Sequence, residues 1–506
     1  MGIKRYIATK DNTITNAFKS DLSTRGSGSN MGASDILEVF SIYAQATTSS
    51  IEKSRILLQF PTTDLIADKQ TDVILSASYQ TNSGKSQANP KYFLRLFNAE
   101  HAQTLPKQFE VTVKAVSRSW DEGIGLDMDE YKDLGSSNWV NAASASGGVT
   151  TWTSAGADFH ASPSHTYSFV KGTEDLELDI TTLVNQWLDG TKANYGLGVF
   201  LSTAYEDSTE RSYYTKKFFG RGSEFFFKRP CIEARWKDAK LDDRGAFYAS
   251  SSLAPKVDNL NTLYFYNYIR GQLKNIEQVG KGNIYVHLYS GSDTNNRPVA
   301  GGTPLRLDLP DDHGSGETGR ILDTPATGGW FTTGIYTASL GLRTSLVKAF
   351  DVWHVGATHY KSGTIEIKTF NTNWEVNPTD RYITSITNLK DSYNTKETAK
   401  LRLYIRSQDW NPNIYTKAIT RVQAELLEQT YYSVYRESDD YTIISYGTSS
   451  ATEHTRLSYD ISGNYFDLDM SLFEPGYAYG IKFLMKVNGN WKETPETFRF
   501  RVDNES

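Results

Sequence analysis

A run of carboxylates in the first half of the sequence is the segment best suited to hold a metal ion. Asp127, Asp129 and Asp133 belong to an acidic stretch that begins at Asp121. Calcium prefers several oxygen ligands from one flexible loop, so these three aspartates are candidate calcium ligands. The stretch lacks the full alternation and the terminal glutamate of an EF-hand. Acidic loops are more often simply solvated, and this second interpretation stays open.

Two histidines, His354 and His359, lie five residues apart, a separation that a metal site can use. Zinc sites combine several His, Cys or carboxylate ligands, and no further ligand of this kind is near the pair in the sequence. On a strand, an odd separation sends two side chains to opposite faces. We therefore expect the two histidines to diverge, and we predict no metal site here.

Sequence signatures of catalysis are missing from the chain. The glycine-rich segment 314–320 lacks the lysine and the following Ser or Thr of a P-loop, and it predicts a surface loop. No Gly-x-Ser-x-Gly elbow is present, and no carboxylate pair stands out as a glycosidase pair. The single cysteine, Cys231, fits a small buried apolar residue. We therefore expect a protein that is not an enzyme and has no cofactor.

Four tryptophans are candidates either for the core or for a binding surface. Trp187 lies on the apolar stripe of an expected helix, and Trp120 closes an expected strand, so both are predicted to be structural. Trp139 and Trp152 lie in a loop rich in Ser, Gly and Ala. Exposed indole rings stack on the apolar faces of sugars, so Trp139 and Trp152 are the predicted binding-surface residues.

The composition favours strands and more than one domain. The chain has 506 residues, and single cores stop growing near about 250–300 residues. Aromatic residues make up 13% of the sequence, which favours half-buried pleated surfaces. The net charge is −6 with both signs interspersed, so nucleic-acid binding is not expected. No signal-peptide core or membrane-length apolar stretch is present, and we expect a chain that stays off membranes and is made in a cytoplasm.

Short alternating runs divide the sequence into four parts. Residues 1–35, rich in Gly, Ser and Asn toward their end, predict an extended N-terminal arm. Residues 36–240 predict a jelly-roll-like β-sandwich with one short helix near 179–190. Residues 255–372 and 378–506 each predict an immunoglobulin-like β-sandwich. The fold class expected is therefore all-β, with tandem sandwich domains.

The segment from about residue 54 to residue 236 resembles the DNRLRE family of β-sandwich domains, which are similar to carbohydrate-binding modules and occur in wall-associated and phage proteins. Five segments carry the resemblance, in the family's order. They are an opening core strand (54–61), a Trp-acidic-Gly segment (116–125), the loop after it (148–159), the helix (179–190) and a closing strand (196–199). The acidic and basic string that names the family is not visible, and no secretion signal precedes the domain. Both departures weaken a surface-anchored bacterial interpretation.

The arm that leads into this domain, residues 24–40, resembles virion structural proteins of tailed phages, particularly marine ones, including cyanophages. This resemblance implies a structural component of the neck, tail or baseplate that is assembled in the host cytoplasm. Its partners would be other virion proteins and copies of itself, and host surface polysaccharide is a further candidate partner. The alternative is a glycan- or receptor-binding adhesin or tail fibre protein, in which the first domain binds polysaccharide.

Overall fold

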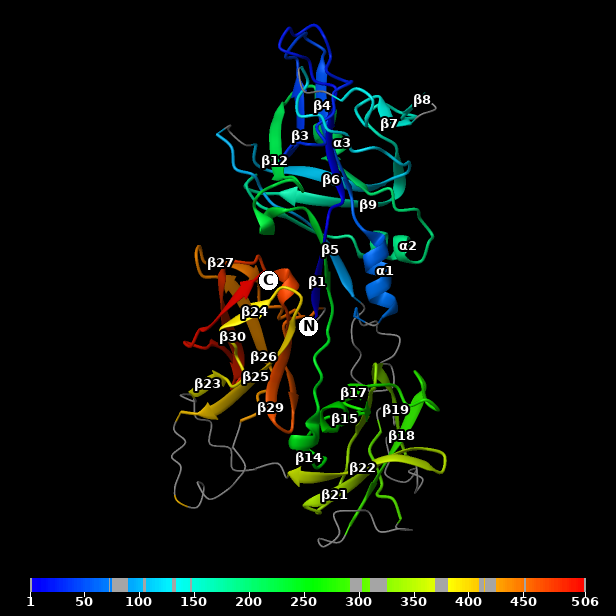
Figure 1. Ribbon diagram of the computed structural model, residues 1–506, viewed down its shortest axis with the longest axis vertical. Helices are drawn as coiled ribbons and strands as arrows, with labels where there is room; N and C mark the ends of the chain where they lie inside the picture. The colour runs from blue at the N-terminus through cyan, green and yellow to red at the C-terminus, as the bar shows by residue number, and fades with distance from the viewer. Residues whose placement is uncertain are drawn as a thin grey trace. The chain divides into compact units, whose positions relative to one another are not determined.

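The computed structural model describes most of the chain and divides it into two compact units. The described residues are 2–71, 73–74, 90–102, 106–129, 133–145, 148–291, 303–309, 325–368, 381–408, 414, 425–449 and 452–504. The N-terminal unit comprises residues 4–71 and 91–235, and the C-terminal unit comprises residues 1–3, 72–90 and 236–506. Both are built mainly from strands (Figure 1).

The N-terminal unit contains two main sheets. The smaller sheet has the strand order β1 (Ile3–Ile7), β13 (Cys231–Arg235), β5 (Lys91–Leu96), β10 (Leu176–Asp179). The larger has the order β12 (Tyr213–Phe219), β3 (Ile36–Tyr43), β4 (Ile51–Gln59), β11 (Leu197–Leu201), β6 (Phe109–Val116), β9 (Phe159–Phe169), and β2 (Lys10–Thr15) also pairs with β4. Buried and half-buried side chains alternate along β3 and β5, as expected for strands with one face on a core. A separate hairpin is formed by β7 (Asn141–Ala145) and β8 (Gly148–Thr151).

Strands β1 and β2 lie in the region expected to form an extended arm. Residues 3–7 and 10–15 are paired into the two sheets, and Ile3, Tyr6 and Ile14 are at most 4% exposed. The expectation of an arm without regular structure is therefore wrong over these residues. The Gly- and Ser-rich composition that suggested the arm belongs to the segment after β2. A deletion of residues 1–34 would remove strands rather than a loose terminus.

Three α-helices occur in the described part of the N-terminal unit, where the sequence predicted one. They are α1 (Thr62–Gln70), α2 (Thr181–Leu188) and α3 (Thr203–Glu206). The predicted helix is confirmed as α2, with Leu183, Val184 and Trp187 on its buried face. Gly190 follows its end with a φ of 76°, the left-handed conformation that glycine adopts without strain. Helix α1 was missed because Leu65 is its single buried residue, which leaves almost no apolar periodicity.

A buried carboxylate, Glu233, ties together the smaller sheet of the N-terminal unit. Glu233 lies on β13 and is 1% exposed. Its oxygens accept from Arg5 Nε of β1 at 2.6 Å, Arg95 Nη1 of β5 at 3.0 Å and Arg235 Nε of β13 at 2.6 Å. Arg235 also forms a two-point contact with Glu177 of β10, at 2.8 and 2.9 Å. Charged hydrogen bonds therefore span all four strands of this sheet.

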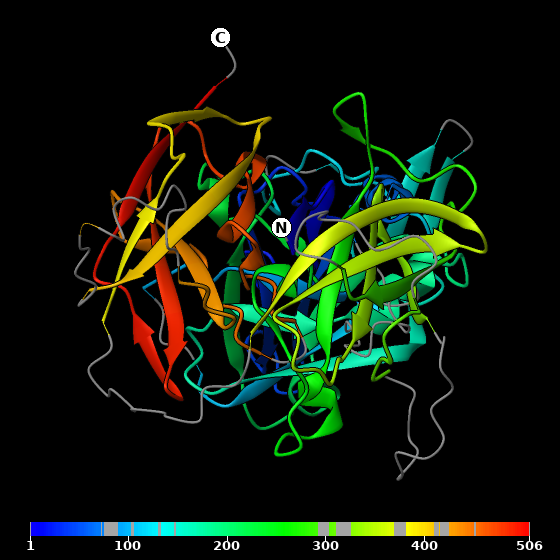
Figure 2. The ribbon, with the colours of Figure 1, turned by 90° about the horizontal axis from the view of Figure 1, so that it is seen from below.

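The first half of the C-terminal unit is a curled sheet. Its strand order is β14 (Phe247–Tyr248), β22 (Thr358–Lys368), β21 (Lys348–Val355), β18 (Asn283–Tyr289), β19 (Ala326–Thr332), β20 (Ile335–Leu340), β15 (Asn261–Tyr266). Three strands separate β15 from β21, yet the rings of Phe265 and Trp353 lie 5.6 Å apart. The sheet therefore bends over one shared core, and the long strands β21 and β22 are the curved yellow-green ribbons of Figure 2. The short pair β16 (Tyr268–Ile269) and β17 (Gln272–Leu273) stands apart from it.

The second half of the C-terminal unit is a two-sheet sandwich, called here the C-terminal sandwich. The smaller sheet has the order β23 (Tyr382–Ile386), β25 (Thr398–Ser407), β29 (Gly463–Asp469), β28 (Ser458–Asp460). The larger has the order β24 (Ser392–Asn394), β32 (Phe498–Asp503), β30 (Ala478–Val487), β26 (Thr430–Arg436), β27 (Tyr441–Ile444), with β31 (Asn490–Glu493) paired to β30. Aromatic rings join the sheets, because Phe466 of β29 contacts Tyr432 of β26 and Phe483 of β30.

The expected all-β class with tandem sandwich domains is confirmed by these sheets. The short 3₁₀ helices η3 (Phe226–Lys228), η4 (Asp243–Gly245), η5 (Lys256–Asn259) and η7 (Met470–Leu472) complete the regular structure described. The predicted boundary between residues 372 and 378 lies outside the described residues and stays a prediction. Among the described residues, no helix combines the length and apolar character needed to cross a membrane.

Candidate binding surface

The two tryptophans predicted to be exposed are buried. Trp139 and Trp152 are 8% and 5% exposed, and both belong to a core cluster that includes Trp120. Trp152 Nε1 donates to the Asn138 carbonyl at 2.8 Å, and the Arg55 guanidinium lies 5.2 Å from the Trp139 ring centre. The prediction of a sugar-binding platform at Trp139 and Trp152 is therefore wrong. The polar loop that carries them folds back over the sheet, and this buries their apolar rings away from water.

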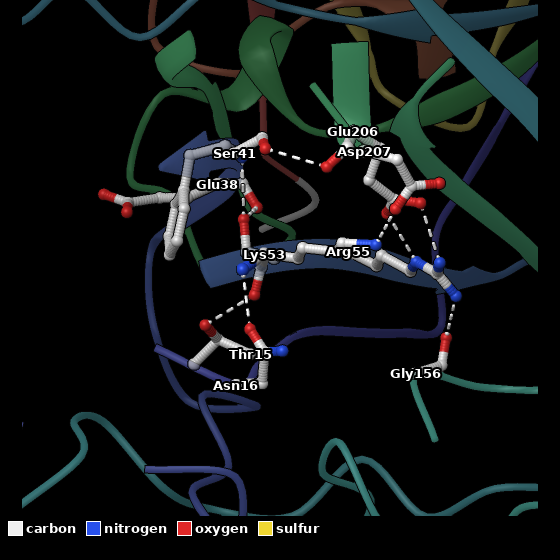
Figure 3. A network of polar contacts seen from close by, with 11 residues as sticks. Thr15, Asn16, Glu38, Ser41, Lys53, Arg55, Gly156, Glu206 and Asp207 are labelled. Atoms are coloured by element: carbon white, nitrogen blue, oxygen red, sulfur yellow. Dashed lines mark hydrogen bonds and ion pairs between the residues drawn. The ribbon is translucent and has the colours of Figure 1, made fainter. Parts of the chain in front are cut away.

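A polar network centred on Arg55 holds that loop in place (Figure 3). Arg55 reaches Glu206 through Nε at 2.7 Å and Nη2 at 2.8 Å, and its Nη1 donates to the Gly156 carbonyl at 2.7 Å. Ser41 Oγ donates to the Glu206 carbonyl at 2.9 Å, which adds strand β3 to the network. The guanidinium thus makes three hydrogen bonds within the fold, and Figure 3 shows it pointing from β4 toward α3. This network braces the domain, because it joins β4, α3 and the loop at Gly156.

The calcium candidates are not gathered around a common point. Asp127 accepts from the backbone N–H of Asp129, and Asp129 pairs with Lys19 Nζ at 3.3 Å. Asp133 accepts from Ser136 Oγ at 2.8 Å. Among the residues that the structure describes, no group of three or more His, Cys, Asp or Glu side chains is arranged to hold a metal ion. The glycine-rich segment 314–320 lies outside the described residues.

The histidines His354 and His359 converge rather than diverge. They face each other across the hairpin of β21 and β22, with ring centres 5.9 Å apart, because a turn separates them. A third histidine, His287 of β18, stacks on His354, and its Nδ1 lies 3.0 Å from His354 Nε2. The expectation of opposite faces assumed one continuous strand and is wrong. His287 could not be predicted as a member, since it reaches the cluster only through the register of β18 with β21.

Acid is expected to destabilise the C-terminal unit through this histidine cluster. Burial, together with the neighbouring imidazoles of His287 and His359, outweighs the Gly356 carbonyl and lowers the pKa of His354. The pKa of His354 is therefore lower in the folded protein than in the unfolded chain, where it is about 6.5. The folded protein keeps its full stability above about pH 6.5 and loses stability as the pH falls through the folded pKa of His354. Calorimetry between pH 7.5 and pH 5 should show a smaller loss of melting temperature for His354→Gln than for the wild type. Equal losses would contradict this assignment.

The outer face of the larger sheet of the C-terminal sandwich carries aromatic side chains next to charged ones. Residues of β30 alternate, so that Lys482 and Lys486 point outward while Ile481 and Phe483 are buried. Their partners across β26 and β31 share the outer face. Together they are Tyr431, which is 2% exposed, Tyr435, Lys482, Trp491 and Glu493, with Tyr446 just after β27. We call this set the tyrosine face. Strands β26, β27 and β30 that carry it are labelled in Figure 1.

A hollow of about 410 Å³ lies on the tyrosine face. Tyr435, Tyr446, Lys482 and Glu493 line it, together with the smaller polar side chains of Ser433, Asp440, Thr442 and Ser445. Tyr435 lies against Gly480 of β30, where an added Cβ atom would come within 2.4 Å of the phenol Cζ. Only glycine at this position lets the ring lie close to the sheet. The opposite side of the Tyr435 ring, which is half-buried, is therefore turned toward the hollow.

Hydrogen bonds hold the polar groups of the hollow in fixed positions. Tyr446 Oη donates to Glu493 Oε2 at 3.1 Å, and Lys482 Nζ lies 3.7 Å from Glu493 Oε1. Burial and the nearby Glu493 carboxylate raise the pKa of Tyr446, so its phenol stays protonated at neutral pH. Lys482 Nζ lies 5.2 Å from the centre of the Tyr435 ring. The site thus presents an aromatic surface edged by donors and acceptors.

Comparisons with known proteins add only distant likenesses. No family model and no curated protein matches the chain. Among solved structures, a chimeric titin Z1Z2 tandem is 9% identical over 44% of this chain and 84% of its own, with a TM-score of 0.15. The tandem Ig repeats of Dlar are 11% identical over 44% and 82%, with a TM-score of 0.13. The Yersinia pseudotuberculosis adhesin InvE is 15% identical over 48% and 59%, with a TM-score of 0.15. At TM-scores this low, the likenesses carry no argument about function.

Proposed function

We propose that the chain is a structural, non-enzymatic component of a tailed-phage virion, placed in the neck, tail or baseplate. It acts by binding other virion proteins and copies of itself, and it is assembled in the host cytoplasm. The observation that carries this proposal is the bracing of the sandwich by internal charge networks, at Glu233 and at Arg55. Rigid scaffolds of this kind present loops and sheet faces in fixed positions, and such surfaces set assembly specificity. The resemblances of residues 54–236 and of residues 24–40 support the phage setting.

Mass spectrometry of purified virions tests this proposal. Virions of the phage that encodes the chain are purified through a density gradient, and the chain is quantified against the major capsid protein. A structural component is expected at the same copy ratio in independent preparations, and it should survive high-salt washing because its interfaces are specific. Trace amounts that vary between preparations, or that wash away in salt, would contradict the proposal.

A receptor- or glycan-binding adhesin, such as a tail fibre protein, is the second candidate function. The tyrosine face favours it, because half-buried aromatic rings beside paired polar groups are typical of ligand-binding surfaces. A glycan site in the first domain does not support it, since Trp139 and Trp152 are buried. In this second function the C-terminal sandwich makes the contact outside the particle.

A further inference from the structure

We propose that the tyrosine face binds an uncharged oligosaccharide, with one sugar ring stacked on Tyr435 in the hollow. This inference rests on the second of the two functions above, in which the chain contacts a surface outside the particle. It names the ligand class and the residues of the site, both of which lie in the C-terminal sandwich.

The shape of the hollow fits a sugar ring. Pyranose rings have an apolar face of C–H groups, and aromatic rings attract such faces when they lie flat beneath them. Tyr435 is held flat by Gly480, and it keeps its position because its Oη donates to Glu437 at 3.0 Å. A preorganised ring loses little conformational entropy when the ligand binds. The volume of about 410 Å³ is within the range of small-ligand sites.

The polar groups around Tyr435 match the hydroxyls of a sugar. Lys482 Nζ supplies a donor, the Glu493 carboxylate supplies an acceptor, and Tyr446 Oη, whose proton is donated to Glu493, supplies a second acceptor. Ser445 and Thr442 add hydroxyls at the exposed rim of the hollow. Because sugar hydroxyls donate and accept, they need neighbours of both kinds, and this edge offers both.

The charges of the hollow favour an uncharged ligand over an anionic one. Of the described residues that line it, Lys482 is the one cation, and Glu493 lies 3.7 Å from its Nζ. Asp440 adds a second carboxylate at the rim. An acidic sugar would therefore meet more negative than positive charge, which opposes binding.

An oligosaccharide longer than the ring stacked on Tyr435 would meet a second aromatic side chain, Trp491, along the same face. Trp491 of β31 is 46% exposed, lies opposite Lys486 in register and packs edge-on against Tyr431 at 5.6 Å. From Gly480, beneath Tyr435, to Lys486 the strand advances six residues, about 20 Å at the usual rise. Two aromatic contacts at that spacing suit an extended oligosaccharide rather than a monosaccharide.

Glycan binding by the full-length protein and its variants tests the inference. The purified chain is applied to a printed array of bacterial surface polysaccharides, both neutral and acidic, and the best-bound oligosaccharide is titrated by calorimetry. Tyr435→Ala is expected to weaken binding about tenfold or more. Trp491→Ala should weaken binding to long oligosaccharides more than to short ones. Tyr435→Phe, which keeps the ring, should retain most of the affinity.

Tyr268→Ala is the matched control, because Tyr268 is 61% exposed and lies in β16, away from the tyrosine face. Thermal unfolding of every variant excludes misfolding as the cause of a loss, and the exposed Trp491 provides a variant with no core to disturb. The inference is overturned if the wild type binds no neutral glycan, or if Tyr435→Ala and Tyr268→Ala bind alike. The incorporation of Tyr435→Ala into virions is measured separately. A variant that loses glycan binding but is incorporated normally has a defect in the sugar site, whereas loss of incorporation indicates a defect in the structural role.

Discussion

Replacing Glu233 with glutamine is expected to lower the free energy of unfolding of the N-terminal unit by about 3–5 kcal/mol. Burial alone would raise the pKa of Glu233, but the guanidinium groups of Arg5, Arg95 and Arg235 outweigh it and hold the pKa well below its usual value. A depressed folded pKa means that the stabilisation is complete above about pH 4.5 and is lost only in stronger acid. At neutral pH, glutamine would leave the three guanidinium groups without their buried counter-charge.

Urea denaturation at pH 7 measures this effect, and Glu177→Gln is the matched control. Glu177 also pairs with Arg235, but it is 39% exposed, so its loss should change stability by less than about 1 kcal/mol. A Glu233→Gln protein as stable as Glu177→Gln would mean that the network adds nothing beyond a surface ion pair. The supporting role assigned to it would then be wrong.

Truncating Trp187 to alanine should destabilise the N-terminal unit by about 3–5 kcal/mol. Trp187 is 4% exposed on the buried face of α2, and its removal would open a cavity that a short helix cannot refill. Thermal or urea unfolding of the variant provides the measurement. A melting curve unchanged from the wild type would exclude a packed α2.

Trp491→Ala provides the comparison for Trp187→Ala, because it deletes the same side chain from a largely exposed position. Substitutions at such positions usually change stability by no more than about 0.5 kcal/mol. Trp187→Phe gives an intermediate case, since phenylalanine keeps most of the apolar volume. A graded order from Trp491→Ala through Trp187→Phe to Trp187→Ala would assign the effect to burial.

The sequence predicted those parts of the fold that depend on local periodicity. Helix α2 follows from the spacing of Leu183, Val184 and Trp187, and strands such as β6 follow from alternation. The parts it missed have weak local signals. Helix α1 buries only Leu65, and β1 and β2 precede a Gly- and Ser-rich segment that obscured them. Local composition cannot show which short runs are completed by distant partners.

The binding surface was harder to predict because it depends on register. Tyr431 and Tyr435 share one face of β26, and this alternation is visible in the sequence. The position of Gly480 beneath Tyr435 is fixed only by the pairing of β26 with β30. The burial of Trp139 and Trp152 likewise depends on a loop that packs on Arg55. Contacts of this range have no signature in a single sequence.

The parallel pairing of β24 with β32 has a consequence for how the C-terminal sandwich is made. Ser392 and Asp503 are 111 positions apart, and β32 lies between β24 and β30 in the sheet. Such distant partners slow folding, because the long intervening loop must close before the pairing gives any stabilisation. A nascent chain therefore leaves β24 without its partner until β32 has emerged from the ribosome. During that interval, the open edge of β24 is available for pairing with another chain, which favours aggregation.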